Sequence, residues 1–463
     1  MTQTTQNPRT SETRATDQHA AGPRPTASSA PSSKDIHQIL DLALRVGEVL
    51  LSSGAGAADV AATMHSIAVA AGLRNADVDV TFTALSMSYQ TRYDEPPIYV
   101  VRNVKHRDID YEDLTEVDAI VRDLLTGDVD HAEARTRLAR ITSSGHHRPR
   151  WAVDLSWGVM GLGVALMLGG DWIVMAIAFF AAAGVDLLQR TMSRHRLPSF
   201  YKQVAGGLLA TLIAVVVAAT RVQVDPSLVV TASIIMLLSG IGFMGAVQDA
   251  LTGFYVTAGA RLLEVMLATG GIIAGVSGGL AVARMLDVSV ALEPGAAGWS
   301  YLPVMAFGSG LSAAAFAFSS YAPTRSLLPI GVIGAGGELV YAVLRVPGFG
   351  QAWASAGAAV AIGVVSYSVA GRVRVPPLVV VVSAIVPLLP GLSIYRGLAL
   401  MAGGDSYGVL AMVTAAGIAI SLASGVILGE FVAQPLKREA RRLEGRLAGP
   451  RLVGPLRARA VKK

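Results

Sequence analysis

Ten long apolar stretches follow one another between Trp151 and about Gln434, and they constrain the fold more than any other feature of the chain. Each is close to the ~20 residues that an α-helix needs to cross a bilayer. The pattern therefore predicts a polytopic α-helical membrane protein with ten transmembrane helices. We place them at residues 152–170, 172–189, 201–220, 227–247, 257–285, 300–319, 327–344, 351–370, 377–401 and 407–433.

Composition excludes several other classes of protein. Charged residues make up 15% of the 463-residue chain, against about 25% in an ordinary soluble domain. That share excludes a disordered protein and leaves too few charges to cover a purely soluble enzyme. The chain has no cysteine, which excludes disulfides, thiolate metal sites, iron–sulfur clusters and cysteine nucleophiles.

The chain divides into five segments by composition. Residues 1–34 are polar and lack the apolar core of a signal peptide, so we expect a disordered tail that stays in the cytoplasm. Residues 35–150 predict a small soluble α+β domain. Residues 151–290 and 299–436 hold five apolar stretches each, and residues 437–463 form a basic tail.

Periodicity within residues 35–150 distinguishes helices from strands. Apolar residues first follow helical spacing. From Val78 to Ala84 they alternate with polar ones, which predicts one strand with a buried face. We expect helices over 36–50, 60–71, 114–124 and 134–141, and strands over 77–84 and 98–104.

Arginine and lysine set the orientation in the membrane. The heavier basic clusters, including those at 190–202 and 372–374, fall on the even-numbered connections between the ten stretches. This alternation places both termini in the cytoplasm. The basic tail beside the last membrane helix predicts contact with anionic lipid and not with nucleic acid.

A pattern of small residues in the membrane part repeats at a constant offset. Small residues spaced by four, which let helices approach closely in lipid, occur on the fifth and the tenth stretch at an offset of 150. They are Gly271, Gly275 and Gly279, matched by Ser421, Gly425 and Gly429. Two halves of five helices must have opposite orientations, so the sequence predicts two inverted five-helix repeats, the plan of many secondary transporters.

Interrupted helices occur at matching places in the two halves. Pro387, Pro390 and Gly391 break the ninth stretch, and Gly240 and Gly242 loosen the fourth. Such matched breaks are the best pointer in a sequence to a transporter's binding site. The alternative is a proline kink that neighbouring helices repair.

Two ionisable residues in the second half are candidates for substrate binding. Glu338 lies well inside the seventh stretch, where a carboxylate is costly and could hold a proton or a substrate ammonium group. Arg396 follows the break at Pro390 and Gly391, where a helix start and a guanidinium together suit a carboxylate. The alternatives are a structural carboxyl group and an arginine that extends to the interface.

A second group of charges lies near the cytoplasmic side. Arg261 and Glu264 are three apart on one helix face and can pair, and Asp249 is close to them in sequence. They predict a coupling or gating network, or else an interfacial ion pair with a helix cap. All eight histidines precede residue 196, so a proton would travel on carboxylates, and no metal site is expected.

Other modes of action receive less support. The phosphate loop of an ATP-driven pump is absent from the sequence. Ser86 and Ser88 lack the glycines of a nucleophile elbow, so we expect no enzyme activity. A passive channel stays open as an alternative.

The chain resembles the threonine/serine exporter family over nearly all residues after 35. Residues 44–55, 79–89 and 130–141 of the N-terminal part are similar to that family. So are Gln248 to Gly253 with Arg261 and Glu264, and Leu389-Pro390-Gly391 followed by Tyr395-Arg396-Gly397. Ala61 departs from the pattern, which has an acidic residue there.

The resemblance implies a cytoplasmic N-terminal domain, ten helices and proton-driven export of small hydrophilic metabolites. It adds Tyr395 to the candidate substrate-binding residues. Because two-component relatives are linked to succinate, a dicarboxylate is the alternative substrate.

We therefore expect a secondary transporter of the bacterial inner membrane that exports threonine or serine with protons. Its partners would be the substrate, protons and the lipid bilayer, without a cofactor, and a homo-oligomer is left open.

Overall fold

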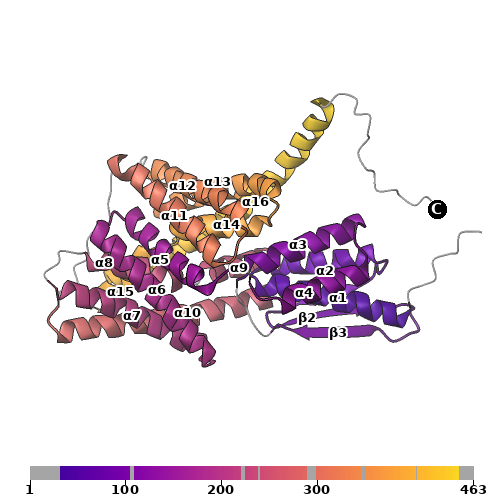
Figure 1. The fold of residues 1–463 in the computed structure, drawn as a ribbon, viewed down its shortest axis with the longest axis horizontal. Coiled ribbons are helices and arrows are strands. Elements are labelled where there is room, and N and C mark those ends of the chain that lie inside the picture. The colour runs from indigo at the N-terminus through magenta and orange to yellow at the C-terminus, as the bar shows by residue number, and fades with distance from the viewer. Residues whose placement is uncertain are drawn as a thin grey trace, which may run out of the picture.

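The computed structural model describes residues 32–104, 109–146, 148–220, 225–237, 240–288, 299–345, 348, 350–402 and 404–447. Figure 1 shows an N-terminal unit of helices and strands beside a body of long helices, with α9 where the two parts meet. The predicted tail 1–34 and basic tail 437–463 lie largely outside the described residues. The helix α1 begins at Ser33, and α16 continues to Leu447.

The N-terminal unit packs four helices and one sheet around an apolar core. A capping box between Ser32 and Asp35 begins α1, and Gly127 ends α3 in a left-handed conformation with φ of 81°. The predicted apolar face of α1, from Ile36 to Leu50, is buried. The elements are α1 (Ser33–Ser52), α2 (Ala57–Ala70), β1 (Asp77–Val80), β2 (Ala84–Tyr89), β3 (Ile98–Asn103), α3 (Tyr111–Thr126) and α4 (His131–Ser143).

The sheet corrects one expectation from the sequence. Residues 77–84 were expected to form one strand, but β1 ends at Val80 and β2 begins at Ala84. The Thr81 N–H donates to the Ala84 carbonyl at 2.9 Å and closes a tight turn between them. The strands therefore pair antiparallel in the order β1-β2-β3, with Val80 opposite Leu85 and Leu85 opposite Arg102.

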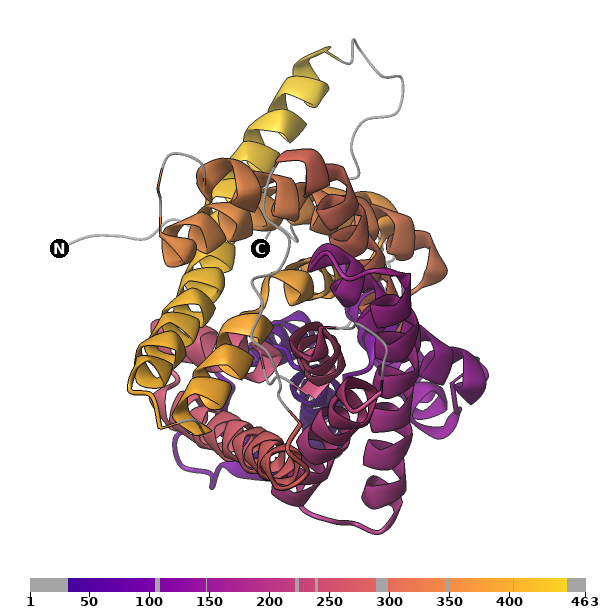
Figure 2. The same ribbon diagram turned by 90° about the vertical axis from the view of Figure 1, so that its left-hand side faces the viewer.

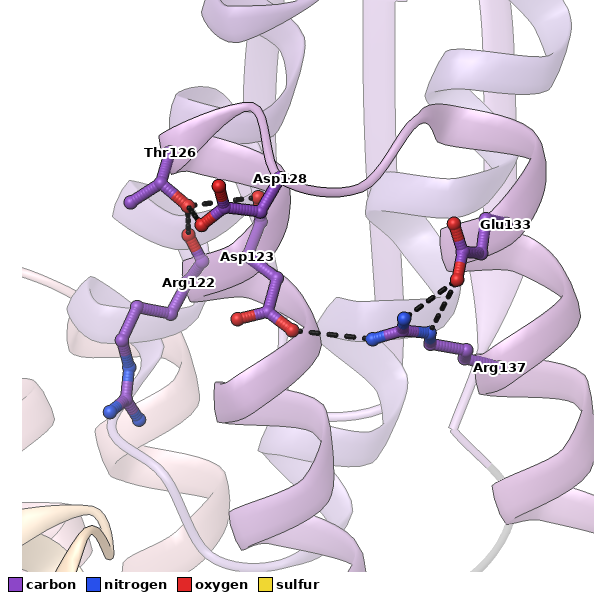
Figure 3. A network of polar contacts seen from close by, with 6 residues as sticks. All are labelled: Arg122, Asp123, Thr126, Asp128, Glu133 and Arg137. Atoms are coloured by element: carbon purple, nitrogen blue, oxygen red, sulfur yellow. Dashed lines mark hydrogen bonds and ion pairs between the residues drawn. The ribbon is translucent and has the colours of Figure 1, made fainter. Parts of the chain in front are cut away.

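Surface charges join α3 to α4 (Figure 3). Arg137 on α4 donates to Asp123 on α3 at 3.2 Å and to Glu133 on its own helix at 2.6 Å. Thr126 donates to Asp128 at 2.7 Å at the end of α3. Because these groups are exposed, each ion pair contributes about 0–1 kcal/mol, and the buried apolar faces supply most of the stability.

Helices occupy all ten predicted membrane stretches. Within the described residues, seven helices are long and apolar enough to span a membrane, or nine when each of two bent pairs counts as one span. The first predicted span is helical as α5 but is not among these nine. The unbroken helices are α5 (Arg150–Met167), α6 (Trp172–Arg194), α7 (Ser199–Ala218), α10 (Tyr255–Met285), α11 (Leu302–Ser319), α12 (Thr324–Arg345), α13 (Gln351–Val373) and α16 (Tyr407–Leu447).

The fourth and ninth stretches are broken in the same way. The fourth consists of α8 (Pro226–Ile234), the 3₁₀ turn η1 (Ile235–Leu237) and α9 (Gly240–Leu251). The ninth consists of α14 (Pro377–Ile385), η3 (Val386–Leu388) and α15 (Gly391–Ala402). The three parts have 9, 3 and 12 residues in both cases. The bends are 51° and 42°.

The glycines that repeat at an offset of 150 allow close helix packing in both halves. On α10, a Cβ at Gly271 would lie 2.7 Å from the Phe200 carbonyl oxygen of α7. On α16, a Cβ at Gly425 would lie 2.6 Å from the Ala356 carbonyl oxygen of α13. Figure 2 shows the long helices surrounding the shorter segments of the broken spans. The same kind of close backbone contact therefore joins α7 to α10 and α13 to α16.

Candidate functional site

A cavity of about 180 Å³ lies where the break in the ninth span meets α12. We call it the central cavity. Glu338 and Tyr341 of α12 line it, together with Pro387 to Ser393 and Arg396 around the break. Thr231 and Ile235 of the fourth span, Gln351 and Ser355 of α13, and apolar residues of α5, α11 and α16 complete it.

Glu338 reaches the central cavity because glycines let α12 pack closely on its neighbours. A Cβ at Gly337 would lie 2.6 Å from the Ile362 side chain, and Ser309 of α11 donates to the Gly334 carbonyl at 3.0 Å. The Glu338 side chain is 4% exposed. A carboxylate held this deep between apolar helices strongly favours a bound proton or a bound cation.

Arg396 lies on the first turns of α15, which begins at the break. Gly391, Leu392 and Ser393 open this helix on the cavity wall, so the N-terminal end of α15 faces the central cavity. Helix starts carry free N–H groups and a partial positive charge that suit an anion. The partly buried Arg396 guanidinium adds a full positive charge on the same wall.

The structure brings together four of the seven predicted substrate-binding residues: Glu338, Arg396, Pro390 and Gly391. Tyr395 is 0% exposed but is not among the residues that line the central cavity. Gly242 lines a different cavity, described next, and Gly240 begins α9. Sequence reasoning missed the hydroxyl groups of Thr231, Ser355 and Ser393, because single hydroxyls in apolar helices are common.

A larger cavity of about 520 Å³ lies between the N-terminal unit and the membrane helices, beside the places where the two parts are in contact. We call it the junction cavity. Ser52, Gly54 and Phe82 of the N-terminal unit line it, as do Gly242, Arg261 and Glu264 of the membrane part. Ile235 and Leu389, one from each broken span, line both the junction cavity and the central cavity. These two apolar side chains therefore lie between the cavities.

Asp249 and Arg261 bind the N-terminal unit beside the junction cavity. Arg261 Nε lies 3.2 Å from Asp249 Oδ2, and the two side chains are 8% and 0% exposed. Asp249 Oδ1 accepts the N–H of Ala57, the first residue of α2, at 2.7 Å. Arg261 donates to the Ala55 carbonyl at 2.8 Å. Both side chains therefore form hydrogen bonds with the backbone of the segment that joins α1 to α2.

Two further bonds support the same junction. Thr257 donates to the Val80 carbonyl at 3.1 Å, and Gln248 donates to Asp59 at 3.3 Å. We expected Arg261 to pair with Glu264. The structure places the Asp249 carboxylate against Arg261, and Glu264, which lies on the junction cavity, also interacts electrostatically with the Arg261 guanidinium. Such a pairing across helices depends on tertiary packing, which spacing within one helix does not report.

A second contact joins α3 to the connection between α11 and α12. The Tyr111 N–H donates to the Ser320 carbonyl at 2.9 Å, and His146 stacks on Tyr321 at 3.8 Å. Burial raises the pKa of Asp110, which lies 3.2 Å from His146. Burial, with the charge of Asp110, raises the pKa of Asp113 to about 6. Charged and titratable groups thus also lie at this contact.

No group of three or more histidine or acidic side chains within the described residues could hold a metal ion. Each of the two cavities is lined by one acidic side chain, one arginine and several hydroxyl groups, which are suited to binding a small polar molecule.

Comparison with known proteins gives consistent matches along the chain. A family model described as "Putative threonine/serine exporter" matches residues 41–283, and one described as "Threonine/Serine exporter, ThrE" matches residues 305–432. A "Probable threonine/serine exporter" of Mycobacterium tuberculosis is 36% identical over 433 residues, which cover 90% of this chain and 81% of the relative. A "Threonine/serine exporter" of Corynebacterium glutamicum is 34% identical over 411 residues, covering 87% and 84%. No solved structure matches.

These matches extend over the N-terminal unit, both broken spans and the central cavity. They identify a multi-pass bacterial membrane protein that acts as a transporter and not as an enzyme. The chain belongs to the threonine/serine exporter family.

Proposed function

We propose that this protein exports threonine and serine from the cytoplasm and couples their movement to the proton motive force. The observation that carries the proposal is the composition of the central cavity. It combines the buried Glu338 carboxylate with Arg396 and the start of α15. The printed names of the two relatives support these substrates.

The two charges on the cavity complement a zwitterionic amino acid. Arg396 and the N-terminal end of α15 would hold the substrate carboxylate, and Glu338 would hold the ammonium group or the coupling proton. The volume of about 180 Å³ suits a small metabolite, since pockets for drug-sized ligands measure about 300–1,000 Å³. A dicarboxylate such as succinate would bring a second negative charge toward Glu338, which disfavours that alternative.

We propose alternating access through ten spans, with α5 as the first. The equal segment lengths of the two broken spans support an inverted repeat. Ile235 and Leu389 would form the apolar barrier between the junction cavity and the central cavity. A continuous passive channel would lack such a barrier.

The junction cavity would be the cytoplasmic entrance, with the N-terminal unit and both termini in the cytoplasm. Asp249 and Arg261 hold the N-terminal unit against this entrance, and Glu264 lines it. A change in their pairing would open or close the path from the cytoplasm. We therefore retain the three residues as the coupling or gating group.

Transport in proteoliposomes tests the proposal. Vesicles loaded with labelled threonine would be assayed with and without an imposed proton gradient, in the presence of serine or succinate as competitor. We expect gradient-dependent threonine movement that serine inhibits and succinate does not.

Threonine movement that is equally fast with and without the proton gradient would contradict proton coupling. Inhibition by succinate without any threonine movement would contradict the substrate assignment and favour a dicarboxylate.

A further inference from the structure

We propose that Thr231 is a specificity-determining residue that recognises the substrate's hydroxyl group; this rests on the proposed function. Thr231 lies on α8, one turn before the break in the fourth span, and lines the central cavity with Glu338 and Arg396. Its side chain is 1% exposed. Within the described part of the chain, its hydroxyl oxygen has no hydrogen-bond partner.

Four buried hydroxyl groups of the described membrane helices have no hydrogen-bond partner, those of Thr231, Ser366, Ser383 and Tyr395, and of these four only Thr231 lines the central cavity. Serine and threonine in apolar helices usually donate to the carbonyl one turn earlier. Ser233, two residues away on α8, donates to the Val229 carbonyl at 2.7 Å, and Thr211 donates to the Gly207 carbonyl at 2.8 Å. A buried hydroxyl without a partner is destabilising, so a ligand in the cavity that supplies one gains affinity.

The repeat shows that the helix does not need a hydroxyl at this position. Thr231 is the sixth residue of α8, and Val382 is the sixth residue of α14 in the other broken span. Val382 is also 1% exposed. Valine and threonine have nearly the same shape, so equivalent packing at the two positions accepts an apolar side chain. The hydroxyl of Thr231 is therefore available for a role other than folding.

The hydroxyl group matches what threonine and serine share. Each substrate carries one side-chain hydroxyl, which can donate one hydrogen bond and accept others, as can that of Thr231. With the carboxylate at Arg396 and the ammonium group at Glu338, a third contact at Thr231 would fix the side chain. A site that hydrogen-bonds a substrate hydroxyl discriminates against analogues that lack it, because its own polar group then stays unpaired.

The test compares hydroxylated amino acids with analogues that lack the hydroxyl. Uptake of labelled threonine into proteoliposomes preloaded with threonine would be competed with threonine, 2-aminobutyrate, serine and alanine. The variants are Thr231→Val, Thr231→Ser and, as a matched control, Thr211→Val, which removes a buried hydroxyl from a helix position off the cavity.

We expect wild-type protein to prefer threonine over 2-aminobutyrate, and serine over alanine. Thr231→Val should reduce each preference about tenfold. This is the change in affinity expected when one hydrogen bond is lost and the substrate hydroxyl stays unpaired. Thr231→Ser and Thr211→Val should keep both preferences.

Two results would overturn the inference while leaving the proposed function intact. One is threonine exchange in wild type that 2-aminobutyrate inhibits as strongly as threonine does, which needs no variant to fold. The other is a folded Thr231→Val protein that keeps the wild-type preference. Absence of any threonine exchange in wild type would instead contradict the proposed function itself.

Discussion

Among single residues, Glu338 carries the most specific prediction about transport. Replacing it by glutamine keeps its size and removes its charge and its ability to release a proton. We expect Glu338→Gln to lower gradient-driven threonine efflux about tenfold or more, the equivalent of one charge-assisted hydrogen bond. Efflux from proteoliposomes with an imposed gradient measures this change.

Glu430→Gln is the matched control for Glu338→Gln. Glu430 accepts a hydrogen bond from Tyr367 at 3.2 Å and lies off the central cavity. The control should transport normally. Wild-type coupled efflux in a correctly folded Glu338→Gln protein would remove Glu338 from the mechanism.

Asp113 predicts a pH-dependent stability at the contact between α3 and the membrane helices. Its pKa in the folded protein is about 6, raised above the ordinary 3.8 first by burial. The folded state therefore favours the protonated carboxyl, and this stabilisation is lost as the pH rises through about 6. Asp113→Asn should raise the melting temperature at pH 7.5, and the gain should shrink toward zero near pH 4.

Melting curves in detergent at the two pH values measure this effect. Asp123→Asn on the same helix is the control, because Asp123 is paired with Arg137 on the surface. An equal gain for Asp113→Asn at both pH values would mean that its ionisation does not matter at this contact.

Among the elements, glycine and proline determined how much could be predicted. They mark both broken spans in the sequence, because each residue type changes the backbone directly. Alternation of apolar and polar residues did not separate β1 from β2, because the pattern continues through the turn at Thr81. A period of two reports burial of alternate residues and contains no information about where the chain reverses.

The spacing of glycines on α10 predicts which positions tolerate a methyl group. A Cβ at Gly271 would meet the α7 backbone, whereas one at the adjacent Gly270 would meet nothing within 4 Å. We expect Gly271→Ala to lower the melting temperature clearly by forcing α10 away from α7. Gly270→Ala should leave it unchanged or slightly higher, since alanine favours helix. Equal effects would show that close packing of α10 on α7 is not needed.

In the whole molecule, the least predictable feature is the contact between the N-terminal unit and the membrane helices. Arg396 could be proposed for the site because it follows the break in the ninth stretch, and Glu338 because a carboxylate inside an apolar helix is costly. The partners of Asp249 and Arg261, in contrast, are backbone atoms of Ala55 and Ala57, about two hundred residues earlier. Because nearly every residue type has the same backbone N–H and C=O groups, the sequence does not indicate which of them a distant side chain will bind.

This contact predicts that Asp249 holds the two parts of the molecule together. Asp249→Asn would leave the Arg261 guanidinium buried beside a neutral group, and breaking a buried ion pair costs roughly 3–5 kcal/mol. We expect the N-terminal unit to loosen, with faster hydrogen exchange at Ala57 and faster proteolysis of the segment around Arg148. Asp171→Asn is the matched control, because Asp171 caps α6 through a local bond to the Val174 N–H at 2.8 Å.

The same variant separates attachment of the N-terminal unit from transport. If the N-terminal unit controls the entrance, Asp249→Asn should also raise threonine movement without a proton gradient, because the junction cavity opens more often. Faster exchange at Ala57 with unchanged transport would assign Asp249 to assembly alone. Unchanged exchange at Ala57 would show that the buried pair does not hold the N-terminal unit, since that amide donates directly to Asp249.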